Sequence, residues 1–158
     1  MHSKYEQRQH GLGRGQSGFS LIEALVALVV LSVGMIGIAA LYGQGLSAGR
    51  TALYRTIAVN LAAEMADRIR ANRLGRASYT GAGAARPCGP GGGTNCTPAE
   101  LAEYDVNLWQ ALVGQQLPGG VGTVAFAAGT PPTYTIAVTW QDFGGATTYQ
   151  ITPQIPSF

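Results

Sequence analysis

Residues 15–33, GQSGFSLIEALVALVVLSV, carry the strongest structural signal in this chain of 158 residues. They join a short basic leader, which ends at Gly18, to a long apolar run that opens at Phe19. The run holds one charge, Glu23, four residues after Phe19. A carboxylate near the middle of a hydrocarbon layer costs about 2.5–3.5 kcal/mol on insertion scales, so it needs a function and a partner.

The apolar run is long enough to cross a membrane. The eighteen residues from Ala24 to Leu41 carry no charge, and a helix of this length can span a bilayer with modest tilt. The leader contains Lys4, Arg8 and Arg14, and the positive-inside rule assigns it to the cytoplasm. The body of the chain is therefore expected outside. An ordinary secretory signal fits less well, because its small-residue site follows the apolar core.

The order of basic leader, glycine, apolar run and glutamate resembles the class III signal of type IV pilins and pseudopilins. This resemblance implies that a prepilin peptidase cuts between Gly18 and Phe19, and that Phe19 is then N-methylated. It also implies a role for Glu23, the fifth residue after the cut, in subunit assembly. In that family the glutamate neutralises the α-amine of the next subunit.

Without the leader, residues 19–158 are electrically neutral, because seven arginines balance seven carboxylates. The formal charge of +2 therefore belongs to residues 1–18. Strong non-specific DNA binding depends on several Lys or Arg contacts with phosphates, so neutrality argues against it.

Without the leader, the chain also lacks most of the side chains used in catalysis, because His2, His10 and Lys4 all lie in the leader. The rest of the chain lacks the residues for a Ser-His-Asp site, a histidine metal site, a Schiff base or a P-loop. Paired carboxylates could act in principle, although such residues are usually just solvated. They would come from Glu100, Glu103, Asp105 and Asp142. We expect no enzyme activity, no cofactor, no metal and no small-molecule substrate.

The two cysteines, Cys88 and Cys96, lie in PCGPGGGTNC. Outside the cytoplasm such a pair indicates a disulfide, and closing so short a loop stabilises the fold by roughly 2–3 kcal/mol. A metal site needs two more ligands, and a redox pair is more usually CxxC. A structural disulfide is the prediction.

Beyond the apolar run, the pattern becomes that of an amphipathic helix. Apolar residues recur every four positions, at Leu53, Ile57, Leu61, Met65 and Ile69. No proline occurs before Pro87, which predicts one helix from about residue 19 to about residue 72, roughly 80 Å long. Its first half can be buried only in lipid or against other helices, and its second half packs one face on a compact domain.

Four glycines, Gly34, Gly37, Gly43 and Gly45, weaken the apolar half of this helix by roughly 1 kcal/mol each relative to alanine. Small residues let membrane helices approach closely. The pilin resemblance implies a second role, because this segment can lose helicity when a pilin enters the filament. The two interpretations are compatible.

The C-terminal part predicts one helix followed by three strands. Thr97 suits the N-cap, Pro98 the first turn and Glu100 a capping box. The apolar side of this helix is expected from Leu101, Leu108, Trp109 and Leu112. Strands are expected at residues 121–127, 134–141 and 147–153, with a hairpin turn at Gly144 and Gly145. The fold class is therefore α+β, with a long N-terminal helix packed on a small antiparallel sheet.

The segment LAAEMADRIRANRLG, residues 61–75, resembles the helix end of PilV-type minor pilins. A cysteine pair, a helix with Trp109, LPGGVGTV and VTWQD continue the resemblance, which covers most of the chain apart from the glycine-rich loop. Arg68, Arg70 and Arg73 suit a helix C-terminus, and Asp67 can pair with Arg70. The alternative role for these arginines is a contact with another minor pilin or with an anionic surface.

The resemblance implies a minor pilin that helps prime or cap a type IV pilus, in twitching motility, adhesion or DNA uptake. Its partners would be the prepilin peptidase, other minor pilins, the major pilin and inner-membrane lipid. The implied organisation is a leader at residues 1–18, a transmembrane half-helix at 19–45 and a globular domain at 46–158. That domain would be periplasmic before assembly and on the cell surface afterwards. Two alternatives remain: a type II secretion pseudopilin, and a pilus-displayed module that binds DNA or a surface.

Overall fold

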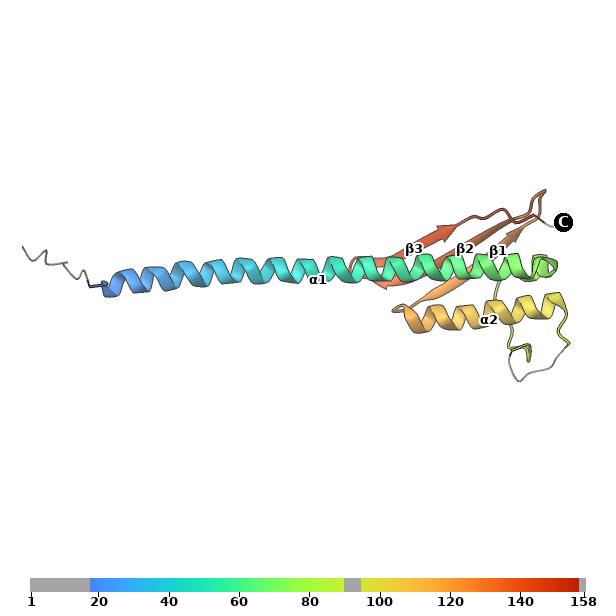
Figure 1. Ribbon diagram of the computed structural model, residues 1–158, viewed down its shortest axis with the longest axis horizontal. Helices are drawn as coiled ribbons and strands as arrows, with labels where there is room; N and C mark the ends of the chain where they lie inside the picture. Colours follow the sequence, from blue (N-terminus) through green and yellow to red (C-terminus); the bar gives the residue numbers. More distant parts are fainter. Residues whose placement is uncertain (1–17, 90–94, 157–158) are drawn as a thin grey trace, which may run out of the picture. The chain divides into compact units, whose positions relative to one another are not determined.

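The computed structural model describes residues 18–89 and 95–156 (Figure 1). Its helices are α1 (Leu21–Ala71), the short 3-10 helix η1 (Arg73–Ser78) and α2 (Pro98–Gln116). Its strands are β1 (Val121–Ala127), β2 (Thr133–Asp142) and β3 (Gly145–Ile151). The predicted α+β class is confirmed. The leader residues named above, apart from Gly18, lie outside the described residues.

The chain divides into two compact units, Met1–Gly43 and Gln44–Phe158, and α1 contributes to both. The helix has 51 residues and is slightly shorter than the sequence predicted. It begins after Ser20, whose carbonyl accepts from the backbone N–H groups of Glu23 and Ala24 at 3.0 and 3.2 Å. Its first turn is therefore closed by backbone hydrogen bonds.

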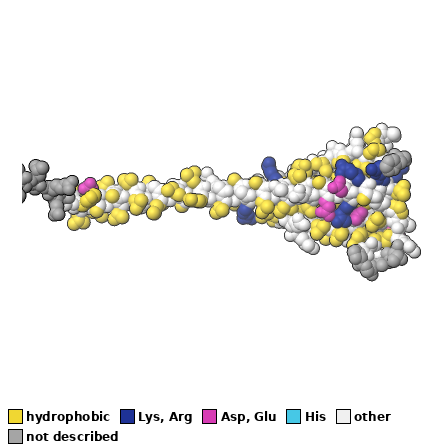
Figure 2. All heavy atoms as spheres, viewed as in Figure 1, with side chains coloured by type: hydrophobic (Ala, Val, Ile, Leu, Met, Phe, Trp, Pro, Cys, Tyr) yellow, Lys and Arg dark blue, Asp and Glu magenta, His cyan; other side chains and the backbone are white. Residues whose placement is uncertain are grey.

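In the N-terminal unit, the described side chains of α1 are exposed on every side. Figure 2 shows hydrophobic side chains along the visible face of this part of the helix. By length and composition, α1 contains a stretch able to cross a membrane, and none of that stretch is buried. Apolar side chains without protein cover require lipid or other helices around them.

In the second unit, α1 buries one face. The buried residues are Ala58, Leu61, Ala62, Met65, Ala66 and Ile69. The predicted stripe was wrong at its first member, because Leu53 is 57% exposed. A strict four-residue repeat advances about 40° round a helix at each step, so it drifts off a face of period 3.6.

The three strands form one antiparallel sheet in the order β1-β2-β3. Val121 pairs with Thr139, and Asp142 pairs with Gly145. The hairpin turn is therefore Phe143-Gly144, one residue earlier than predicted, and Gly145 opens β3 with φ at +120°. The expected alternation in β2 is confirmed, with Tyr134, Ile136, Val138 and Trp140 buried.

Helix α2 has the predicted start. The Thr97 hydroxyl accepts from the Glu100 backbone N–H, and the Glu100 side chain accepts from the Thr97 N–H, which completes a capping box. The predicted apolar side was displaced by one position, because Leu101, Leu108 and Leu112 are only half-buried. The buried face consists of Ala102, Asp105, Val106, Trp109 and Val113.

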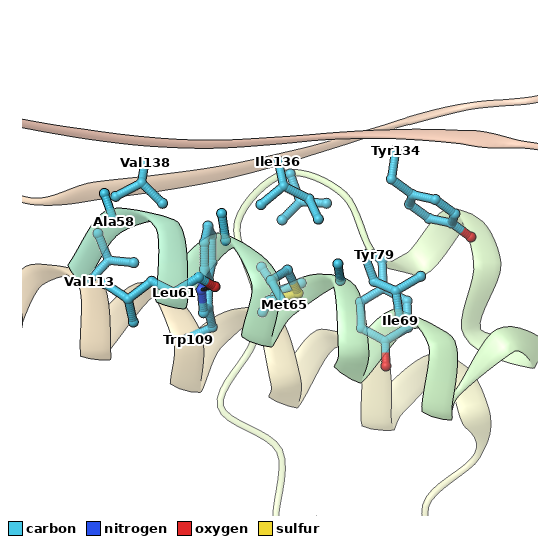
Figure 3. Close-up of a cluster of buried hydrophobic side chains, with 14 of the residues drawn as sticks. Ala58, Leu61, Met65, Ile69, Tyr79, Trp109, Val113, Tyr134, Ile136 and Val138 are labelled. Carbon is cyan, nitrogen blue, oxygen red and sulfur yellow. Dashed lines mark hydrogen bonds between the residues drawn. The ribbon is translucent and has the colours of Figure 1, made fainter. Parts of the chain in front are cut away.

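Side chains from α1, α2 and β2 point toward one another in a single core (Figure 3). Trp109 fills its centre, and its indole N–H donates to the Leu61 carbonyl at 2.8 Å. A Cβ on Gly122 would lie 2.5 Å from the Trp109 ring, so strand β1 can approach the indole only with glycine at that position. The sheet is thus covered by two helices, α1 and α2.

Helix η1 fastens the end of α1 to the start of α2. The Asn72 side chain donates to the Pro98 carbonyl at 2.7 Å. A Cβ on Gly75 would lie 2.8 Å from the Pro98 oxygen and 2.9 Å from the Ala102 Cβ. Asn72 and Gly75 of the segment ANRLG therefore have a packing role.

Candidate processing and assembly site

The predicted cleavage residues lie in an accessible segment before α1. Gly18 and Phe19 are exposed and belong to no helix or strand. A Cβ built on Gly18 meets no atom within 4 Å, so packing among the described residues does not require glycine there. Any demand for a small residue at this position would come from an enzyme that binds the segment.

Glu23 lies in the first turn of α1, where the helix macrodipole favours an anion by about 0.3–1 kcal/mol. Its side chain is exposed and forms no hydrogen bond or ion pair with any residue in 18–89 or 95–156. It shares a shallow depression of the helix surface with Ile22, Val26, Ala27 and Leu31. This arrangement leaves a carboxylate exposed among apolar side chains, with no hydrogen-bond or ion-pair partner among the described residues.

The predicted disulfide between Cys88 and Cys96 is confirmed, with the two Cα atoms 5.9 Å apart. The segment before it is tied to α2 by Arg86, which pairs with Glu103 at 2.6 Å, and by the Ala84 N–H, which donates to the Glu103 carbonyl. The disulfide therefore closes a loop whose N-terminal side is already fastened to α2.

The structure contains a buried ionic network, centred on Asp105, that the sequence did not predict. This side chain is 9% exposed and pairs with Arg68 at 2.9 Å, while Arg68 also pairs with Glu64 at 2.7 Å. The Tyr79 hydroxyl donates to the second Asp105 oxygen at 2.7 Å. The network joins α1, α2 and the segment after η1.

Burial affects the ionisation of this network in two ways. Burial acts to lower the pKa of Arg68, but its hydrogen bonds to Glu64 and Asp105 outweigh this effect and raise the pKa above the usual value. Burial raises the pKa of Tyr79, and its hydrogen bond to the Asp105 carboxylate raises it further. Both groups therefore keep their ordinary charge states over a wide pH range.

The expectation of solvated carboxylates was wrong for Asp105. A usable signal existed, because Asp105 lies between Ala102 and Trp109 at the spacing of a buried helix face. Glu103 pairs with Arg86, and Asp142 accepts from the Thr51 hydroxyl at 3.0 Å. In the part of the chain that the structure describes, none of the four candidate carboxylates is paired with another.

The three arginines near the end of α1 have different roles. Arg70 pairs with Asp67 at 2.6 Å, as the sequence predicted. Arg73 donates from its Nε to the Arg70 carbonyl, which suits a helix C-terminus. Arg68, by contrast, points into the network with Asp105.

Over residues 18–89 and 95–156, no group of three His, Cys, Asp or Glu side chains could hold a metal ion.

Two family models match the chain. Residues 13–39 match the prokaryotic N-terminal methylation motif, and residues 40–107 match a family described as type IV pilin Tt1218. These matches support a type IV pilin. No curated protein and no solved structure matches the chain.

A type IV pilin is a structural, non-enzymatic subunit of a pilus. The methylation motif includes Gly18, Phe19 and Glu23, and it implies processing by a prepilin peptidase and assembly with other pilins. The apolar part of α1 fits membrane anchoring before assembly. The second match runs through the end of α1, η1, the disulfide region and half of α2.

Proposed function

We propose that this pilin is a PilV-type minor pilin, which helps prime or cap a type IV pilus. The observation that carries the proposal is the carboxylate of Glu23, which is exposed among apolar side chains and has no partner within residues 18–89 and 95–156. The segment ADRIRAN and the match over residues 40–107 favour a pilus subunit over a secretion pseudopilin. The neutral charge of residues 19–158 argues against a DNA-binding module.

In this proposal, prepilin peptidase cuts between Gly18 and Phe19, and Phe19 is then N-methylated. Cleavage creates an α-amine four residues before Glu23, and the chain between Glu23 and Arg50 contains no other cation. Within one helix, water and headgroups already solvate that amine at the membrane surface. A neighbouring subunit's amine must be drawn deeper, where pairing with Glu23 offsets the desolvation of both charges. Glu23 therefore acts between subunits.

The proposed orientation follows from the leader. Its basic residues keep it in the cytoplasm, so the globular unit is periplasmic before assembly and on the pilus surface afterwards. The proposed direct partners are the other minor pilins and the major pilin. Membrane lipid surrounds the apolar half of α1 until the subunit enters the filament.

The test is to express Glu23→Val and Glu23→Gln, shear the pili and compare the sheared and membrane fractions by immunoblot. Both variants should be made, inserted and cut, because an uncharged helix enters lipid more easily. Both should be largely lost from the sheared fraction. Asp67→Asn is the matched control, because Asp67 is an exposed carboxylate on the same helix. The Asp67→Asn variant should be incorporated into pili normally.

Gly18→Glu should block cleavage, whereas the Glu23 variants should be cut normally. Full-length protein should therefore accumulate in the membrane with its leader attached. Normal incorporation of Glu23→Val would contradict the assembly role and leave Glu23 as a peptidase-recognition residue. An intact leader on assembled wild-type protein, detected by mass spectrometry, would contradict the cleavage site.

A further inference from the structure

The turn between β2 and β3 is an unusual feature of the globular unit, because it presents a large aromatic side chain to solvent. Phe143 lies in this two-residue turn and is 85% exposed. The core already contains the aromatic residues of β2, so burial in this chain does not explain Phe143. An exposed phenylalanine at a hairpin tip suits contact with an apolar phase.

The hairpin tip is held against the beginning of the globular part of α1. The Thr51 hydroxyl donates to the Asp142 carboxylate at 3.0 Å, and the same oxygen accepts from the Phe143 N–H at 2.8 Å. The Asp142 charge is thus engaged inside the turn. Phe143 and Arg50 both line a hollow of about 180 Å³, together with Ser47, Tyr54 and Gln141.

Two charged residues, Arg50 and Asp142, line this hollow. The Arg50 guanidinium donates to the Tyr54 hydroxyl at 3.1 Å and stacks over its ring, 5.7 Å from the centroid. Residues 24–63 contain no acidic residue, so this part of α1 carries no charge that repels an anion.

The chain itself keeps this end of the unit close to the membrane. Arg50 follows Leu41, the last residue of the predicted span, by only nine residues, all within α1. Nine helical residues rise about 14 Å at most, against a headgroup layer of roughly 5–8 Å on each side of the bilayer, so the backbone of Arg50 lies within about one arginine side-chain length of the headgroups. Leu46, between them, is also exposed and apolar.

We infer that the β2–β3 hairpin tip docks on the membrane surface before assembly, with Phe143 among the lipid headgroups and Arg50 against their phosphates. The ligand chemistry is an anionic phospholipid, which suits an aromatic side chain beside a basic one. The inference rests on the proposed function, because it needs the subunit to be membrane-anchored. Entry into the filament would require this contact to be released.

The test uses the full chain in vesicles of phosphatidylcholine, with or without phosphatidylglycerol. An environment-sensitive fluorophore is attached to Phe143→Cys, while the native cysteines are protected in their disulfide. Lipids that carry a quencher near the headgroup report contact at the hairpin tip, and lipids that carry a quencher deep in the acyl chain report burial of a label in the span. Two control labels are Leu31→Cys, in the predicted span, and Leu74→Cys, which is 81% exposed on η1.

The label at Phe143→Cys should lose most of its fluorescence to the quencher, and the loss should be larger in vesicles with phosphatidylglycerol. The label at Leu74→Cys should keep its fluorescence. Adding Arg50→Gln should lower the ratio of docked to free hairpins about fivefold in phosphatidylglycerol. Quenching at Leu31→Cys but not at Phe143→Cys would overturn the inference and leave membrane anchoring intact. No quenching at Leu31→Cys would instead contradict the anchoring. The label at Phe143→Cys could instead be shielded from water in a way that depends on protein concentration and not on lipid. That result would overturn the inference in favour of contact with a second copy of the chain.

Discussion

The two halves of α1 share one backbone geometry and differ in what surrounds them. In residues 21–43, the described side chains are exposed on all sides, and Glu23 is the single charge. In residues 44–71, one face is buried from Ala58 to Ile69, while arginines and carboxylates lie on the other faces. The comparison teaches that helix formation here does not depend on a protein core, whereas the choice of a buried face does.

The first prediction tests that difference at the centre of the core. Trp109→Ala removes a fully buried side chain and its hydrogen bond to Leu61, so it should destabilise the globular unit by about 3–5 kcal/mol. Denaturant unfolding of the protein in detergent, followed by tyrosine fluorescence and circular dichroism, measures the change. Leu31→Ala, in the exposed half of α1, should leave the unfolding midpoint unchanged. Equal effects of the two substitutions would contradict the proposed division of α1.

The second prediction concerns the covalent constraint in the globular unit. Cys88→Ser with Cys96→Ser should lower the free energy of unfolding by about 2–3 kcal/mol, because the loop before Thr97 becomes free in the unfolded chain. Membrane insertion should not change, since an apolar span does not depend on these cysteines. Labelling of both cysteines by a thiol reagent in native protein would refute the disulfide outside the cytoplasm.

The third prediction uses pH to test the network that joins α1 to α2. The pKa of Tyr79 is raised in the folded state, so its contribution is complete below the unfolded pKa of about 10 and is lost as the pH rises above it. Tyr79→Phe should cost about 1–2 kcal/mol at neutral pH, because Asp105 loses a donor. It should also flatten the alkaline fall in the melting temperature. A weaker alkaline dependence should remain from Tyr134, whose pKa burial also raises. An unchanged alkaline profile in the variant would exclude Tyr79 as the titrating group.

The smallest effect is expected at the start of α2. Thr97→Ala should cost about 1 kcal/mol, because the Glu100 N–H loses its side-chain acceptor. Hydrogen bonds from the Thr97 backbone and side chain lower the pKa of Glu100. The stabilisation from Glu100 is therefore present above its unfolded pKa of about 4.3 and is lost as the pH falls through the lower folded value. Thr97→Ser, which keeps the hydroxyl, is the control and should retain the wild-type melting temperature.

Local signals in the sequence predicted the elements of the fold closely. The absence of proline before Pro87 and the capping residues of α2 define helices through nearest neighbours along the chain. The alternation in β2 and the spacing of the cysteines act over equally short distances. The exposed Glu23 in an apolar run likewise belongs to the linear pattern, although its assembly partner stays a prediction.

Which side of each helix or strand is buried depends on how these elements pack against one another. Leu53 and Asp105 show why, because burial depends on the angle at which α1, α2 and the sheet meet. A four-residue repeat fits Leu53 as well as Met65, and a charged side chain is normally solvated until an arginine and a tyrosine from distant segments satisfy it. The pattern of residues along the chain was therefore enough to predict α1, α2, the strands, the disulfide and the apolar segment with its single carboxylate. The short helix η1, the buried ionic network and the exposed side chain at the hairpin tip were found only in the structure, because each of these depends on contacts between residues far apart in the chain.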